Sequence, residues 1–109
     1  MSNYIFIETR DPFESHDVRF VVENALNLKN RNHDVTIFFI QNGVLAARQN
    51  CISHEFTRLS DAGITLLADD FSLAERGIVI SELVPQIKPA SIEQLVTALV
   101  QEDTRALWH

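Results

Sequence analysis

Apolar residues occur along this chain in two alternating patterns. Nearly continuous apolar runs occupy 4–8, 35–40 and 64–68. Between these runs, apolar residues recur every three or four positions, as they do on one face of an amphipathic helix. The pattern therefore predicts strands over 4–8, 35–40 and 64–68. Because the second run is β-branched and aromatic with little alternation, it is typical of a strand that is covered on both faces.

Helix signals fill the first interval. Asp11, Pro12 and Glu14 have the spacing of a helix cap, a first helical residue and a capping-box acid, and Ser15 is an alternative cap. The helix that begins here is expected to end in the polar stretch 29–32. Its inward face is predicted to comprise Val18, Val21, Val22, Ala25 and Leu26.

Two shorter helices are expected after the second apolar run. A turn breaks that run, and Asn42 can cap a short helix over 44–48. Ser53 is expected to cap the next helix, which turns Phe56 and Leu59 inward.

The following segment is less regular. Asp70 is expected to cap a short helix that carries Phe71 and stops at Gly77. An extended segment is expected at 78–80. The stretch 81–90 holds two prolines and is interpreted as irregular.

A capping box marks the last predicted helix. Ser91 and Gln94 are three residues apart, the spacing at which each side chain bonds the other's backbone N–H. A final strand is predicted over 105–108. The inward residues expected of the helix are Ile92, Leu95, Val96 and Leu99.

Strands and helices therefore alternate along the chain. This order predicts an α/β fold with a mainly parallel sheet, right-handed crossovers and helices on both faces. The chain has 109 residues, of which 46% are hydrophobic, and is expected to form a single domain over 1–109.

Charge and composition exclude several classes of function. The net charge is −6 and the nine basic residues are scattered, so the sequence lacks the basic stripe of a nucleic-acid-binding protein. No apolar run approaches the length of a membrane span, and the N-terminus does not have the pattern of a signal peptide. A single cysteine cannot form an internal disulfide, which favours a reducing cytoplasm.

A candidate ligand site follows from the parallel sheet. Ligands bind outside the carboxyl ends of parallel strands, where helix N-termini offer free backbone N–H groups. Polar residues follow each of the first three predicted strands, although caps and turns also explain them. Acid–base work by an aspartate pair needs two different environments, and Asp70 is better explained as a cap. The candidate ligand residues are Arg10, Gln41, Asn42, Gly43, Asp69 and Asp70.

Cys51 is the candidate nucleophile. It lies three residues before His54, which is close on a helix, and either His54 or a helix opening at Ser53 would activate the thiol. A buried, inert thiol is the alternative, and a zinc pair here lacks two further ligands. The four histidines show no metal-ligand spacing and the three glycines lie too far apart for a phosphate loop, so no metal or cofactor is expected.

Two motifs resemble a known family. The segments "IQNGVLAA" (40–47) and "ADDFSLAERGI" (68–78) follow the second and third predicted strands. Together they are similar to the DsrE/DsrF/DsrH superfamily, which includes the TusB, TusC and TusD subunits of the sulfur relay. The helix end 74–77 has one inserted residue relative to that pattern, and the C-terminal "ALWH" is also similar. The resemblance covers essentially the whole chain, and the long first helix is closer to the DsrE or TusD branch.

The resemblance implies a three-layer α/β/α fold of flavodoxin-like architecture with a five-stranded sheet. It also implies a cytoplasmic sulfur-handling role, oligomers with related DsrE-, DsrF- or DsrH-type subunits, and exchange of persulfide sulfur with a TusA-like carrier. In the active subunits, the carrier cysteine stands at the start of the helix after the third strand. Here that turn is Ala68-Asp69-Asp70, whose carboxylates would repel a persulfide anion, and Cys51 does not match the position.

Three hypotheses follow for the function. The chain is a partner or assembly subunit of a sulfur relay that lacks the usual carrier cysteine, or a sulfurtransferase that uses Cys51, or a small-ligand binding module at the edge around Arg10, Asn42 and Asp69. A domain of this size buries a limited share of its surface, and apolar residues near the predicted element ends favour an oligomer.

Overall fold

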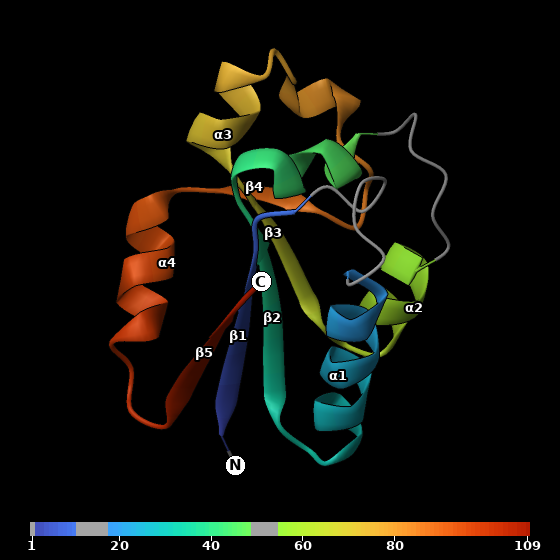
Figure 1. Cartoon of the computed structure of the whole chain (residues 1–109), viewed down its shortest axis with the longest axis vertical. Coiled ribbons are helices and arrows are strands. Elements are labelled where there is room, and N and C mark those ends of the chain that lie inside the picture. Colours follow the sequence, from blue (N-terminus) through green and yellow to red (C-terminus); the bar gives the residue numbers. More distant parts are fainter. Residues whose placement is uncertain (1, 11–17, 49–54) are drawn as a thin grey trace.

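One five-stranded sheet forms the centre of the molecule (Figure 1). The computed structural model describes residues 2–10, 18–48 and 55–109. The strand order is β4-β3-β2-β1-β5, and every neighbouring pair is parallel. The predicted parallel sheet is therefore confirmed. The strands are β1 (Asn3–Glu8), β2 (Asp34–Phe39), β3 (Thr65–Asp69), β4 (Lys88–Ala90) and β5 (Thr104–Trp108).

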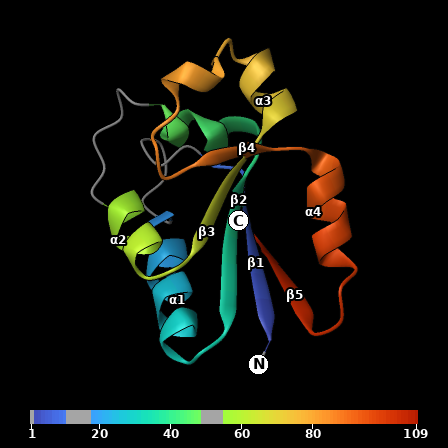
Figure 2. The same cartoon turned by 180° about the vertical axis from the view of Figure 1, so that it is seen from behind.

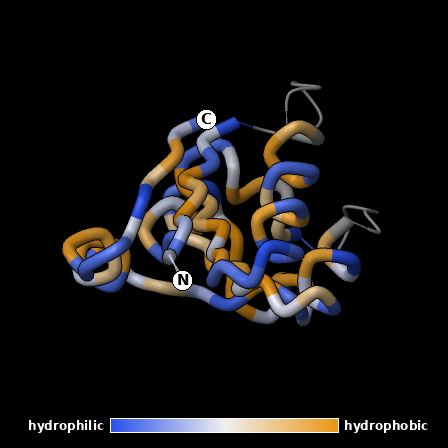
Figure 3. Tube along the Cα trace, turned by 90° about the horizontal axis from the view of Figure 1, so that it is seen from below, coloured by the Kyte–Doolittle hydropathy of each residue, from blue (hydrophilic) through white to orange (hydrophobic). Residues whose placement is uncertain are grey.

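Helices cover both faces of the sheet, which confirms the three-layer α/β/α prediction. Helices α1 and α2 lie on one face and α4 lies on the other (Figures 1 and 2). Seen from below, the strands between these layers are coloured mainly hydrophobic (Figure 3). The helices are α1 (Val18–Asn30), α2 (Glu55–Asp61), α3 (Asp70–Glu75) and α4 (Ile92–Leu99), with the 3-10 helices η1 (Gln41–Ala47) and η2 (Ile80–Glu82). None of the helices in the described ranges is long and apolar enough to cross a membrane.

The strand order contains one reversal. From β1 to β4 the chain steps across the sheet in one direction, and α4 then carries it back to β5 on the other side of β1. Because crossovers between parallel strands are right-handed, a reversed step places its helix on the opposite face. This reversal explains why α4 lies on the face opposite to α1 and α2. The layers match those of flavodoxin-like folds, whereas the strand order differs from the flavodoxin order 2-1-3-4-5.

The core is divided by the sheet into a large and a small cluster. On β1, Phe6 faces the cluster under α1 and α2, while Ile5 and Ile7 face the cluster under α4. On β2, Ile37 and Phe38 are buried on opposite faces, which confirms that this strand is covered on both sides. Burying each such side chain stabilises the fold by roughly 1.5–3 kcal/mol.

Residues 78–80, where a strand or an extended segment is expected, form no strand, although the backbone of Val79 is extended. Val79 and Ile80 are exposed, and the chain turns there into η2. The missing strand is β4, which lies inside the stretch 81–90 that was expected to be irregular. Proline cannot donate a ladder hydrogen bond, but Pro89 is tolerated because β4 pairs only with β3 at the edge of the sheet.

In α4 the predicted cap is confirmed, but part of the predicted inward face is wrong. Ser91 Oγ accepts from the backbone N–H of Gln94 at 3.2 Å, and Gln94 Oε1 accepts from the backbone N–H of Ser91 at 2.8 Å. Leu95 is buried as predicted, but Ile92 and Val96 are exposed. The cluster under α4 is small, so Leu95, Ala98 and Leu99 are enough to cover it, and Ile92 and Val96 face outward.

For α1 and α2, the structure tests the predicted inward residues but not the predicted caps. The inward positions predicted on α1 and α2 are confirmed for Val21, Val22, Ala25, Phe56 and Leu59, all of which are buried. The predicted caps among residues 11–15 and at 53 lie outside the described residues.

The cap predicted at Asn42 is wrong. η1 begins at Gln41, one residue before Asn42, and Ile40 is its capping residue, with no side-chain cap bond.

Candidate functional site

The carboxyl ends of the five parallel strands meet at one edge of the sheet, as predicted. Arg10 follows β1, Gln41, Asn42 and Gly43 open η1 after β2, and Asp69 and Asp70 span the junction of β3 and α3. The backbone N–H of Arg10 donates to Glu8 Oε1 at 2.9 Å. The predicted nucleophile Cys51 and its neighbour His54 lie outside the described residues.

Asp69 is the cap of α3. Its Oδ2 accepts from the backbone N–H of Ser72 at 3.1 Å and from Ser72 Oγ at 2.7 Å. Asp69 is buried at 5% exposure, whereas Asp70 is exposed and is the first residue of the helix. The prediction that Asp70 caps this helix is therefore wrong by one residue. Asp69 has the extended backbone that lets a capping side chain reach the third helical N–H.

Three further hydrogen bonds tie α3 to η1. The backbone N–H of Gln41 donates to Ser72 Oγ at 2.9 Å, so Ser72 links Gln41 to Asp69. Asn42 Oδ1 accepts from Nε and Nη2 of Arg76 at 3.3 and 3.1 Å. The structure thus brings together three predicted site residues through partners on α3, which the sequence did not single out. Within the described residues, the other carboxylate oxygen of Asp69, Oδ1, has no hydrogen-bond partner.

Gly43 joins the end of β2 to the end of β1. The backbone N–H of Ile40 donates to the Glu8 carbonyl oxygen at 3.0 Å. A Cβ atom on Gly43 would lie 2.2 Å from that same oxygen. Only glycine therefore allows the two chain segments to approach this closely.

A buried carboxylate meets an imidazole where β1 and β5 end. Glu8 is 1% exposed, and its Oε1 and Oε2 lie 3.0 and 2.9 Å from Nδ1 of His109. These two residues are 101 positions apart in the sequence. A buried carboxylate without a partner would cost several kcal/mol of stability, so His109 and the backbone N–H of Arg10 explain why Glu8 can be buried.

The backbone of His109 is fixed by three bonds to β1 and the residue after it. Its N–H donates to the carbonyl oxygen of Ile7 at 3.0 Å. Its carbonyl oxygen accepts from the backbone N–H of Thr9 at 2.9 Å and from Thr9 Oγ at 2.7 Å. The imidazole is therefore held in place by both its backbone and its ring nitrogen.

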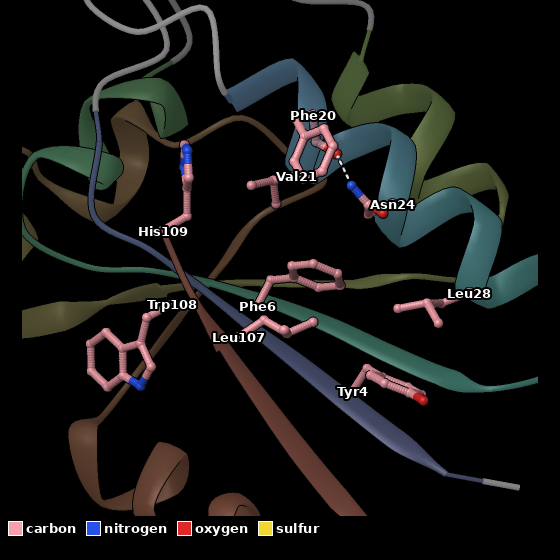
Figure 4. A pocket seen from close by; sticks show the side chains of 9 residues that line it. All are labelled: Tyr4, Phe6, Phe20, Val21, Asn24, Leu28, Leu107, Trp108 and His109. Atoms are coloured by element: carbon pink, nitrogen blue, oxygen red, sulfur yellow. Dashed lines mark hydrogen bonds between the residues drawn. The ribbon is translucent and has the colours of Figure 1, made fainter.

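An apolar groove of about 360 Å³ begins at this imidazole. It runs between α1 and the strands β1 and β5, with His109 at one end and Tyr4 at the other (Figure 4). Phe6 and Leu107 form its floor, and Phe20 on α1 stands across from them.

Comparison with known proteins identifies the family. The family model of the DsrE/DsrF-like family matches residues 2–105. The chain belongs to the DsrE/DsrF-like family. No curated protein sequence matches it.

Solved structures agree with this assignment of the fold. The Escherichia coli YchN protein superposes with a TM-score of 0.89 at 15% identity, over 100% of both chains. MTH1491 from Methanobacterium thermoautotrophicum, a protein of unknown function, gives a TM-score of 0.86 at 17% identity, again over 100% of both chains. BT1422 from Bacteroides thetaiotaomicron, also of unknown function, gives 0.77 at 20% identity, over 99% of this chain and 95% of its own.

This DsrE/DsrF-like chain has two site residues whose role the sequence did not reveal. In the sequence, Glu8 is simply the polar last residue of the predicted strand 4–8, and His109 is one of four histidines that show no metal-ligand spacing. A signal was nevertheless present, because Glu8 follows directly on the buried residues Ile5, Phe6 and Ile7. A carboxylate at such a position needs a partner, which only the fold could supply.

Proposed function

We propose that this chain is a non-carrier subunit of a cytoplasmic sulfur relay. It associates with related DsrE-, DsrF- or DsrH-type subunits and assists persulfide exchange with a TusA-like carrier. Membership of the DsrE/DsrF-like family suggests the sulfur-relay context. The position of Asp69 carries the more specific part of the proposal.

Asp69 ends β3 and caps α3, next to the position where the active subunits are expected to hold their carrier cysteine. Its side chain is turned inward onto Ser72 and caps α3. Asp70 adds a second, exposed carboxylate next to it. Two adjacent carboxylates would raise the energy of a persulfide anion at this turn. The turn is therefore built to begin a helix and is unsuited to carrying sulfur.

Exposed apolar side chains support an associating role. Phe71 on α3, Ile80 on η2, Val100 after α4 and Trp108 on β5 are each more than half exposed. Large apolar side chains exposed on several sides of so small a domain are typical of surfaces that partners cover.

Sulfur loading tests the non-carrier role. The wild type and a Cys51→Ala variant are incubated with a persulfide donor, and their intact masses are measured. We expect no added sulfur atom that depends on Cys51. A Cys51→Ala/Asp70→Cys variant, which places an exposed thiol at the start of α3, serves as the positive control for loading. An adduct on the wild type that is absent from Cys51→Ala would overturn the proposal and make Cys51 the carrier.

Light scattering tests the association. We expect an oligomer at micromolar concentration, either of this chain alone or after addition of a related subunit. A protein that stays monomeric in both cases contradicts the assembly role.

A further inference from the structure

The strand order reverses at β1, so that β5 lies on the side of β1 opposite to β2. Among the described residues, α1 lies on one face of the sheet, and α4, which precedes β5, lies on the opposite face. Ligands of open α/β sheets bind at the carboxyl ends of the strands where the order reverses. Glu8 and His109 stand at this point, whereas Asp69 ends β3, which β2 separates from β1.

The hydrogen bonds of His109 determine which nitrogen can meet a ligand. A carboxylate only accepts, so the proton between Glu8 and His109 belongs to Nδ1. Within the described residues Nε2 has no hydrogen-bond partner, and the side chain of His109 retains 19% exposure. Glu8 fixes the orientation of the ring, since its Oε2 lies 2.9 Å from Nδ1.

The groove next to this imidazole is suited to a small molecule. Its volume of about 360 Å³ falls within the range of small-ligand sites, roughly 300–1,000 Å³. Tyr4, Phe6, Val21 and Leu107 give it apolar walls, and Phe20 stands at its mouth with 71% exposure. Of the side chains that line it, only that of His109 is an imidazole, which can both donate and accept a proton.

We propose that this groove binds a small, weakly acidic molecule with an aromatic or aliphatic body, and that His109 takes its proton. The ligand is bound as an anion against the imidazolium. A ligand that enters protonated loses the proton of its S–H or O–H bond to Nε2, whereas one that enters as an anion, such as a carboxylate, is matched by a proton that Nε2 takes from the solvent. Glu8 is a positioning residue, because it holds Nδ1 and stabilises the imidazolium. The proposal holds whether or not the chain acts in sulfur transfer.

A metal ion is not the ligand that the described residues favour. Within 2–10, 18–48 and 55–109, no three histidine, cysteine, aspartate or glutamate side chains converge as metal ligands do. A lone imidazole backed by a carboxylate has instead the arrangement of an acid–base residue. The same pairing of an imidazolium with a thiolate is what lowers the pKa of reactive cysteines in enzymes, so a thiol ligand also fits.

Calorimetric titration with three similar probes tests the proposal. Benzoate, benzyl mercaptan and benzyl alcohol share the aromatic body, but only the first two have a group that ionises readily. We expect the two acids to bind at least about tenfold more tightly than the alcohol, a difference that one charge-assisted hydrogen bond can produce. Titrations of benzoate in buffers of different ionisation enthalpy are expected to show net uptake of protons by the complex.

Four variants separate the roles. His109→Gln is expected to remove the preference for acids and the proton uptake, and Glu8→Gln to reduce both. Phe20→Ala is expected to weaken all three probes together, whereas Phe71→Ala, an equally exposed phenylalanine on α3, leaves them unchanged. Thermal unfolding verifies that each variant is folded. Absence of binding by all probes, equal binding of acids and alcohol, or an unchanged acid preference in His109→Gln would each overturn the proposal.

Discussion

Two buried carboxylates lie at the same edge of the sheet and have different surroundings. Asp69 is bonded within its own turn, to the backbone and hydroxyl of Ser72 three residues later. Glu8 is bonded to an imidazole that comes from the other end of the chain. The first arrangement begins a helix, whereas the second joins β1 to β5 at the point where the strand order reverses.

The two carboxylates differ in the chemical nature of their partners. Ser72 has no charge to exchange, and its hydroxyl is already bonded to Asp69 and Gln41. His109 has an imidazole ring and lines a groove. Burial of a carboxylate is thus common to both positions, and the nature of its partner distinguishes them.

The largest expected loss of stability is at Gly43, because this residue lets η1 pack against the end of β1. A methyl group at this position would lie 2.2 Å from the Glu8 carbonyl oxygen, so the backbone of η1 or β1 has to move. We expect Gly43→Ala to lower the free energy of unfolding by about 3 kcal/mol, as overpacking against a rigid backbone does. Urea unfolding measures this loss.

Gly77→Ala is the matched control for that loss. A Cβ atom at Gly77 meets no atom within 4 Å, but its backbone has φ +68°. This control is expected to cost about 1 kcal/mol from the left-handed conformation alone. Equal losses in the two variants would show that the contact between Gly43 and Glu8 does not limit the fold.

Removing Glu8 is the next largest effect. We expect Glu8→Ala to cost about 2 kcal/mol in unfolding free energy, since it removes a hydrogen-bonded, buried carboxylate. In a His109→Ala background the same change is expected to cost about 1 kcal/mol less, because the partner is already absent. Glu93→Ala on the exposed side of α4 is the control and should change stability by less than about 0.5 kcal/mol. Additive losses for Glu8 and His109 would contradict the pairing.

Most of the fold could be predicted because local pattern and burial agree. The run 35–40 has the composition of a doubly covered strand, and β2 is buried on both faces. The prediction from local sequence failed where the position of a segment in the assembled fold determines its structure. β4 contains a proline and becomes a strand only because the edge of β3 is available to it. Ile92 and Val96 face outward because the small cluster under α4 needs only a narrow stripe.

The sequence predicted at which edge of the sheet the candidate site lies, but it did not predict all the residues that meet there. The rule for parallel strands correctly placed Gln41, Asn42 and Asp69 at one edge. It did not reveal His109, because the register of β5 beside β1 is a property of the assembled sheet. The reversal in strand order, which singles out the ends of these two strands, is likewise absent from any local pattern.

The smallest effect concerns the cap of α3. Asp69→Ala is expected to lower the free energy of unfolding by about 1 kcal/mol, because the N–H of Ser72 loses its acceptor. Asp70→Ala, one residue later and exposed, should cost only about 0.3 kcal/mol through the weaker field at the helix start. Asp69→Asn should retain most of the stability, since asparagine caps as well as aspartate. Urea unfolding of the three variants measures these differences. If Asp70→Ala were the more damaging change, the cap would lie where the sequence alone placed it, and Asp69 would be free for another role.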